Sequence, residues 1–367
     1  MDSEEVLSRI NQAALEGASE LDLAGLGLRS LPPQIWNVTN LTSLHLEYNE
    51  LSELPSEIGN LISLTHLYIG YNQLVDLPPE IGNLTSLRDL DLRNNQLTEL
   101  PPEIAQLAQL RILSLDHNPL TALPLEIFKF PDLEELHLRV DIITRLPPEI
   151  GNLTSLTSLH IGGNQLTELP PEIGSLTSLR DLHLGGNQLT ELPPEIGNLT
   201  SLRDLALYRN QLTELPPEIG NLTSLMELSL GDNQLTELPP EIGNLTSLRD
   251  LHLEYNQLTE LPSQIGDLAG LESLRVGNNQ LTAIPPSMVK LEKLSQGRSS
   301  IRVVGQFVSR GRIVCSLGRP SSLTHKGLDL SHNLLTILPP EINQLREEWG
   351  IDLSGNPLVR PLSIQAE

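Results

Sequence analysis

The sequence has few cysteines and aromatic residues and no long apolar run. It has a single cysteine, Cys315, so no disulfide can form within the chain, and we expect a reducing compartment. Aromatic residues make up only 3% of the 367 residues, which predicts a core of leucine and isoleucine. No segment approaches the roughly 18 to 20 consecutive apolar residues of a membrane-spanning helix. These shortages argue against a disulfide scaffold and a membrane span.

Basic residues are also scarce. The chain has 23 Lys and Arg against 47 Asp and Glu, which gives a formal net charge of -24. Binding to nucleic acid requires a basic surface that neutralises phosphates, and binding to an anionic membrane has a similar requirement. We therefore expect neither among the partners. The first residues, MDSEEVLSRINQAALEG, lack the basic and apolar regions of a signal peptide, so we expect a cytoplasmic location.

A 23-residue unit, as in LxxLxLxxNQLTELPPEIGNLTS, fills most of the chain. Stacked repeats share one extended core, so the period predicts a single solenoid in place of several globular domains. Asp141 and Leu26 hold the position of the repeat's Asn in two units. The Asn itself occurs at positions 49, 72, 95, 118, 164, 187, 210, 233, 256 and 279, and again, after a break in the period, at 333 and 356.

Each unit predicts one strand and one short helical turn. In LxxLxLxxN, residues alternate as in a strand, with Leu90 and Leu92 facing inward and Asp89, Asp91 and Arg93 facing outward. Strands of successive units are expected to pair in parallel. The return segment LPPEIGNL suits a short helical turn, because proline is tolerated at the first helical position and Gly-Asn ends the helix. The repeat's Asn, with a donor and an acceptor, is expected to bond the backbone of adjacent coils.

We expect the first residues to form a helix that covers the first layer of the solenoid. Asp2 and Glu5 have the spacing of a capping box, and Gly17 is suited to end the helix. The expected organisation is a capping helix, leucine-rich repeats, an irregular basic segment, and final repeats with a tail, in residues 1–20, 21–292, 293–324 and 325–367.

Charge reverses in one part of the chain. From residue 293 to 328, seven Lys and Arg residues occur without any acidic residue, and the repeat's Asn positions at 279 and 333 are further apart than two units require. Two interpretations stay open. The segment is either a decayed repeat or a basic insertion that folds back onto the acidic repeats or binds an acidic partner.

The motif LTxLPxxIGxLxxLxxLxLxxNQ, from about Leu21 to Leu291 and again from 325 to 358, resembles the leucine-rich repeat of the 23-residue class. It is similar to bacterial leucine-rich repeat proteins, plant intracellular Ras-group repeat proteins and the repeat segment of Roco GTPases. The run IxxAxxxGxxxLDLxxLxLxxLP, from Ile10 to Pro32, resembles the start of bacterial Roco repeat regions. The chain has no P-loop, GxxxxGK[ST]. The resemblance therefore implies an α/β solenoid, a horseshoe with a concave parallel sheet and short helical or 3-10 turns on the convex side, together with a binding role and no catalytic residue.

Side chains suited to binding are confined to the strand half of the unit. All five tyrosines lie within the four residues before the repeat's Asn position, and eight of the nine histidines lie in the same strand segment. Tyrosine and arginine are enriched in binding hot spots. We predict three groups of protein-binding residues: near the N-terminal end His45, Tyr48, His66, Tyr68 and Tyr71 with Asp91 and Arg93; in the middle His137, His160 and His183; and later Tyr208, Arg209, His252, Tyr255 and Arg275.

Catalysis and metal binding are not expected. His137, His160 and His183 occupy one column of successive strands, which aligns the imidazoles and does not converge them on one metal ion. Cys315 has no general base at a fitting spacing. No cofactor or small-molecule substrate is predicted. We expect a non-catalytic scaffold that binds a partner protein on the concave strand face. The alternative is a regulatory or sensor fragment of a Roco-like GTPase signalling system, self-associating as a homodimer.

Overall fold

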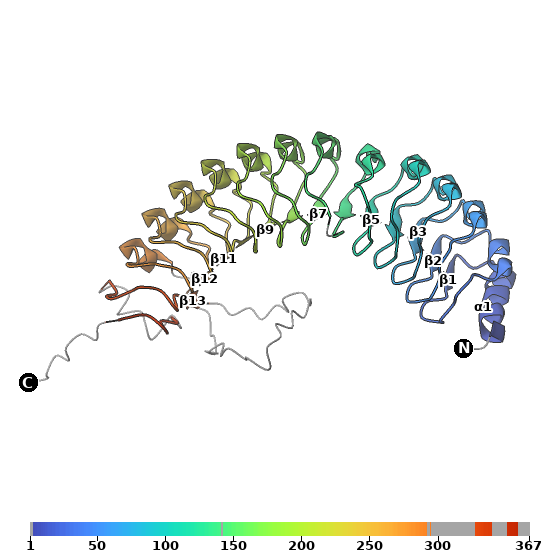
Figure 1. Cartoon of the computed structure of the whole chain (residues 1–367), viewed down its shortest axis with the longest axis horizontal. Coiled ribbons are helices and arrows are strands. Elements are labelled where there is room, and N and C mark those ends of the chain that lie inside the picture. Colours follow the sequence, from blue (N-terminus) through green and yellow to red (C-terminus); the bar gives the residue numbers. More distant parts are fainter. Residues whose placement is uncertain (1–2, 141, 292–293, 295–326, 340–350, 359–367) are drawn as a thin grey trace, which may run out of the picture. The chain divides into compact units, whose positions relative to one another are not determined.

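A computed structural model describes residues 3–140, 142–291, 294, 327–339 and 351–358. The chain divides into two compact units, Met1–Gln211 and Leu212–Glu367. Within each unit, every coil places its strand on one side and its 3-10 turn on the opposite side (Figure 1). The arrangement is that of a leucine-rich repeat solenoid, as predicted. Cys315 and nearly all of the basic segment 293–324 lie outside the described residues.

The first unit begins with helix α1, Ser3–Glu16. Val6, Ile10 and Ala13 form its buried stripe against the first coil. The helix ends at Gly17, whose φ of 62° is left-handed, and Ala18 N–H donates to the carbonyl of Ala13 at 2.9 Å. Asp2 of the predicted capping box lies outside the described residues.

Parallel strands of three residues each line one side of the first unit. Partners in adjacent strands are 23 residues apart, as with Ser43 and His66, so one turn of the solenoid equals one repeat. The strands in order are β1 (Glu20–Asp22), β2 (Ser43–His45), β3 (His66–Tyr68), β4 (Asp89–Asp91), β5 (Ile112–Ser114), β6 (Glu135–His137), β7 (Ser158–His160), β8 (Asp181–His183) and β9 (Asp204–Ala206).

The second unit repeats this pattern with β10 (Glu227–Ser229), β11 (Asp250–His252), β12 (Ser273–Arg275) and β13 (Gly327–Asp329). Ser273 of β12 pairs with Gly327 of β13, although the two residues are 54 positions apart in the chain. The parallel register therefore continues directly from β12 to β13 across the break in the repeat period.

Five-residue 3-10 helices form the opposite side of the coils. In η3, Pro78 is the N-cap and Pro79 the first residue, and Leu84 N–H closes the turn on the carbonyl of Ile81. Gly-Asn forms the last two residues of the turn, so the turn ends there as the sequence predicted. The turns are η1 (Pro33–Asn37), η2 (Ser56–Asn60), η3 (Pro79–Asn83), η4 (Pro102–Gln106), η5 (Leu125–Lys129), η6 (Pro148–Asn152), η7 (Pro171–Ser175) and η8 (Pro194–Asn198) in the first unit, and η9 (Pro217–Asn221), η10 (Pro240–Asn244), η11 (Ser263–Asp267) and η12 (Pro286–Lys290) in the second.

The repeat's Asn joins consecutive coils from inside the core. The side chain of Asn72 donates to the carbonyls of Leu46 and Ile69, at 2.8 and 3.0 Å, and accepts from Leu51 N–H at 3.0 Å. Three buried backbone groups that have no strand partner are thereby satisfied. The predicted structural role of this residue is confirmed, and the core around it is leucine and isoleucine.

Candidate functional site

The parallel register brings the predicted N-terminal residues together as one aromatic cluster, defined as His45, Tyr48, His66, Tyr68 and Tyr71. Tyr48 and Tyr71 stack, with ring centroids 4.4 Å apart and planes inclined by 16°. The ring of Tyr68 lies 4.9 Å from that of His45 and 6.2 Å from that of His66. Tyr48 is 61% exposed and Tyr71 40%. The five side chains thus lie on β2, β3 and the loops after them as a stacked tyrosine pair and a group of two histidines around Tyr68.

Tyr48 and Tyr71 adopt a backbone conformation that disfavours large side chains. Both have a φ of 59°, in the left-handed region, which costs a residue with a Cβ about 1 to 2 kcal/mol. The same position of the repeat is held by Gly163 and Gly186 in two other units, also at positive φ. The sequence analysis missed this conformation, although glycine before the repeat's Asn was a signal for it.

Tyr68 differs from the other two tyrosines because it is half-buried. Its hydroxyl donates to Asp89 Oδ2 at 2.8 Å. Burial raises the pKa of the Tyr68 phenol, and the hydrogen bond to Asp89 and the nearby carboxylates raise it further. Burial also raises the pKa of the Asp89 carboxyl, whereas the hydrogen bond from Tyr68 lowers it. Tyr68 is therefore a fixed part of the surface, with its hydroxyl already engaged.

Asp91 and Arg93 border the cluster as an ion pair. Arg93 Nε lies 2.9 Å from both carboxylate oxygens of Asp91, and this hydrogen bond raises the pKa of the guanidinium. Gly70 makes room for the pair, since a Cβ there would lie 3.1 Å from Asp91 and 3.2 Å from Arg93. Asp91 was predicted to face outward. It lies at an outward strand position, but it is only 8% exposed, because Arg93 and its neighbours cover it.

Glu47 directly precedes Tyr48 in the chain, and only one of its two carboxylate oxygens has a hydrogen-bond partner among the described residues. Its Oε1 lies 3.4 Å from His45 Nδ1, whereas Oε2 is buried and has no hydrogen-bond partner. His45 Nε2 lies 3.6 Å from Glu20 on β1. The aromatic cluster is therefore bordered by carboxylates on the side of β1.

The predicted histidine column of His137, His160 and His183 is present. The rings of His137 and His160 are 4.4 Å apart and those of His160 and His183 4.2 Å apart. His137 Nδ1 lies 3.9 Å from Asp116, and His183 Nε2 lies 3.5 Å from Asp204. Within the described part of the chain, no group of three or more His, Cys, Asp and Glu side chains is placed to hold a metal ion.

The remaining predicted residues form two smaller groups. In the first unit, Tyr208 lies over Gly185, where a Cβ would come within 2.6 Å of the ring, and Arg209 has a φ of 54°. In the second unit, His252 pairs with Arg275 in the β11–β12 register, and Tyr255 is 56% exposed. Each group presents one tyrosine and one arginine, without the ring stacking seen in the aromatic cluster.

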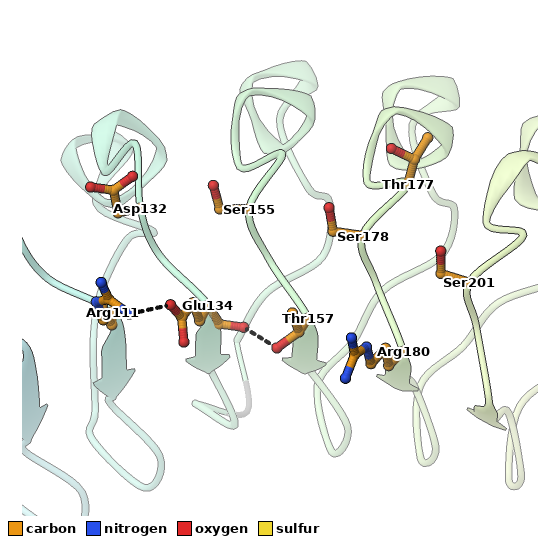
Figure 2. A pocket seen from close by; sticks show the side chains of 9 residues that line it. All are labelled: Arg111, Asp132, Glu134, Ser155, Thr157, Thr177, Ser178, Arg180 and Ser201. Atoms are coloured by element: carbon orange, nitrogen blue, oxygen red, sulfur yellow. Dashed lines mark hydrogen bonds and ion pairs between the residues drawn. The ribbon is translucent and has the colours of Figure 1, made fainter.

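A polar hollow of about 590 Å³ lies apart from the aromatic cluster, beside β5 to β9 (Figure 2). Arg111 Nη1 donates to Glu134 Oε1 at 2.8 Å, and Thr157 Oγ1 donates to the carbonyl of Glu134 at 3.1 Å. None of its residues was predicted as a site, because they precede the strands and lie outside the segments in which the tyrosines and histidines are concentrated. Its lining is Arg111, Asp132, Glu134, Ser155, Thr157, Thr177, Ser178, Arg180 and Ser201.

None of the described helices has the length and apolar character needed to cross a membrane.

Family models for leucine-rich repeats match much of the chain. The model described as leucine-rich repeat region matches residues 59–143, 78–168, 133–209 and 171–255. A model for two leucine-rich repeat copies matches 246–287, and a model for a single repeat matches 40–61. None of the curated proteins compared with the chain matches it.

Several solved structures share this fold. The chain is 34% identical to a leucine-rich repeat protein of Leptospira interrogans, over 95% of this chain and 94% of that one, with a TM-score of 0.72. It is 28% identical to the ectodomain of the receptor kinase GASSHO1/SCHENGEN3 of Arabidopsis thaliana in complex with CASPARIAN STRIP INTEGRITY FACTOR 2, over 95% of this chain and 42% of that one (TM-score 0.67). An internalin of Listeria monocytogenes is 25% identical, over 80% and 93% (TM-score 0.62).

Proposed function

Since the chain belongs to the leucine-rich repeat family, whose fold commonly serves as a protein-interaction scaffold, we propose that it is a non-catalytic scaffold that binds a partner protein on the strand face of its first unit. The aromatic cluster is the main contact surface in this proposal. The histidine column, Tyr208 and Arg209 are its secondary contacts. His252, Tyr255 and Arg275 provide a further contact on the second unit.

The stacked pair of Tyr48 and Tyr71 supports this proposal most directly. Two large aromatic side chains stand in a left-handed conformation that glycine adopts without strain, and both remain exposed. Neither ring fills the core, so folding alone gives no reason for them. Exposed tyrosines held rigidly in place are typical anchors of protein interfaces.

The likeness of Ile10 to Pro32 to Roco repeat regions stays a prediction, as does self-association. Light scattering on the purified chain tests the second, since a homodimer at micromolar concentration would favour the regulatory alternative.

Affinity capture with the intact chain tests the main proposal. We expect a partner that the wild type captures and that a Tyr48→Gly/Tyr71→Gly variant captures much more weakly. Glycine removes the rings and accepts the left-handed backbone, so the melting temperature should change little. Tyr68 is left in place because its hydroxyl bonds Asp89.

His117→Gly is the matched control, because His117 is an exposed residue at the same repeat position, has a φ of 58° and is not one of the proposed contacts. It should retain capture if the aromatic cluster is the main contact. Equal capture by the double variant and the wild type would disprove the assignment of the partner to this cluster.

A further inference from the structure

The chemistry around Tyr48 indicates which kind of partner segment the aromatic cluster would accept. The stack of Tyr48 and Tyr71 ends at Tyr48 on the side of β1. There the neighbouring unit has Gly25 at the same repeat position, and no atom lies within 4 Å of where its side chain would begin. The outer face of the Tyr48 ring thus borders open space, which agrees with its 61% exposure.

Acidic residues outnumber basic ones on the strands and loops that carry the aromatic cluster. The first four strands and the loops that follow them, residues 20–25, 43–48, 66–71 and 89–94, contain five carboxylates and one Arg or Lys residue. That cation, Arg93, is already paired with Asp91 at 2.9 Å. Three of the other carboxylates lie on the Tyr48 side, namely Glu20, Asp22 and Glu47.

Within the described residues, no Lys or Arg pairs with these carboxylates. Glu20 and Glu47 lie 3.6 and 3.4 Å from the imidazole of His45, and Glu47 Oε2 is buried there without a hydrogen-bond partner in the part of the chain that the structure describes. Asp22 is exposed and, within the described residues, its carboxylate accepts the backbone N–H of Ala24 at 2.9 Å. An unneutralised group of carboxylates beside an open aromatic face attracts a cation in two ways, by charge and by the ring quadrupole.

We propose that this site binds an arginine-containing basic segment of the partner protein, with the guanidinium over the outer face of Tyr48 and its N–H groups toward Glu20, Asp22 and Glu47. The proposal rests on the protein-binding function proposed above and specifies its chemistry. Arginine fits better than lysine, since its planar group stacks on a ring and donates to carboxylates at the same time. Charge complementarity selects this occupant, because an acidic segment or a second copy of this chain, at -24, would be repelled.

A fluorescent peptide that alternates arginine and glycine is the probe, compared with lysine and glutamate versions of the same length. We expect the arginine peptide to bind the intact chain most tightly in fluorescence anisotropy, the lysine peptide a few times more weakly, and the glutamate peptide not at all. Tyr48→Gly/Tyr71→Gly should weaken arginine-peptide binding about tenfold. Tyr48→Phe keeps the ring face and should retain most of the affinity.

His117→Gly is the control, because it removes another exposed side chain at the same repeat position, with a φ of 58°, and should leave the affinity unchanged. Equal affinity for the arginine and lysine peptides, or equal binding by the double variant, would show that the peptide adheres through net charge alone and would overturn the proposal. Loss of a homodimer in the double variant, seen by light scattering, would assign the site to a second copy and would also overturn it.

Failure of the scaffold function can be distinguished from failure of the basic-segment inference. If affinity capture yields a partner that depends on Tyr48 and Tyr71 but crosslinks to them through an acidic or neutral segment, the scaffold function stands and the basic-segment inference is wrong. If arginine-peptide binding depends on the tyrosines while no captured protein does, the chemistry of the site stands and the scaffold assignment fails.

Discussion

The three clustered tyrosines have different roles at the scale of single residues. Tyr48 and Tyr71 are exposed, mutually stacked and held in left-handed backbone, whereas Tyr68 is half-buried and bonded to Asp89. An experiment that changes all three to alanine therefore mixes binding with stability. Separating them is necessary before any loss of affinity is attributed to the surface.

The Tyr68→Phe variant tests the bond to Asp89. Removing the hydroxyl leaves a half-buried carboxylate without its donor, and we expect a loss of about 1 to 3 kcal/mol in the free energy of unfolding at neutral pH. Burial places the folded pKa of Asp89 above its unfolded value, so its carboxylate lowers stability as the pH rises through the folded pKa. The hydrogen bond opposes this shift, and its removal raises the folded pKa further.

The cost of Tyr68→Phe should therefore shrink toward about pH 4, where protonated Asp89 no longer needs the donor. Urea unfolding of wild type and variant at both pH values measures this difference. Tyr255→Phe is the control and should cost little at either pH, because the Tyr255 hydroxyl has no hydrogen bond among the described residues. A cost that is equal at both pH values would contradict the assigned role of Asp89.

Some residue-level features were readable from the sequence and others were not. The period placed His45 beside Tyr68 and aligned His137 with His160, because a fixed repeat length fixes the register of a parallel sheet. The burial of Asp91 beneath Arg93 depends on rotamers and on the space above Gly70, which a residue pattern does not encode. The residues of the polar hollow, such as Arg111, were missed because they precede the strand segments in which the tyrosines and histidines are concentrated.

At the scale of elements, the glycine that recurs in the 3-10 turns allows consecutive turns to pack closely. The sequence pattern predicted only that this glycine ends the helical turn. A Cβ on Gly82 of η3 would lie 2.6 Å from the carbonyl oxygen of Glu103 in the next turn. Consecutive turns therefore approach too closely for a side chain. The chain itself has Ala105 at this position in η4, where the following turn, η5, departs from the repeat with Leu125 in place of proline.

Substituting this glycine with alanine should destabilise the first unit, and the loss should be larger where the new Cβ would lie closer to the next turn. Gly82→Ala forces a contact with rigid backbone, and we expect a loss of about 1 to 3 kcal/mol. Gly151→Ala is a matched comparison, because its Cβ would meet the next turn at 3.0 Å and 3.1 Å, so its loss should be smaller. Guanidinium unfolding of both variants gives the order. If Gly151→Ala is as costly as Gly82→Ala, close turn packing is not the reason for the glycine.

The repeat predicted that each repeat unit contains a strand and a helical turn, but it did not predict how many residues each of them spans. The segment LxxLxLxxN forms only three residues of strand in each unit, since the backbone then turns left-handed before the Asn. That turn is stabilised by Asn side chains such as Asn72, whose bonds to neighbouring coils were predicted from donor and acceptor count alone.

At the scale of the whole molecule, the net charge of -24 has two opposing effects. Repulsion among carboxylates lowers the stability of the compact state, and the same field attracts basic ligands. Few cations of the described residues offset it, and ion pairs such as Arg111 with Glu134 are exposed, each worth about 0 to 1 kcal/mol. Salt therefore acts on stability and binding in opposite directions.

We expect the melting temperature to rise by a few degrees when sodium chloride increases from about 20 to about 300 mM, because screening shortens the range of the repulsion. Over the same range the affinity for the arginine peptide should fall, since screening weakens its attraction to Glu20, Asp22 and Glu47. Differential scanning fluorimetry and anisotropy on one preparation measure both, and sodium fluoride at equal ionic strength separates screening from specific chloride binding. A melting temperature that falls with salt would mean that attractive pairs outweigh repulsion, and an affinity that does not fall would remove charge from the recognition of the peptide.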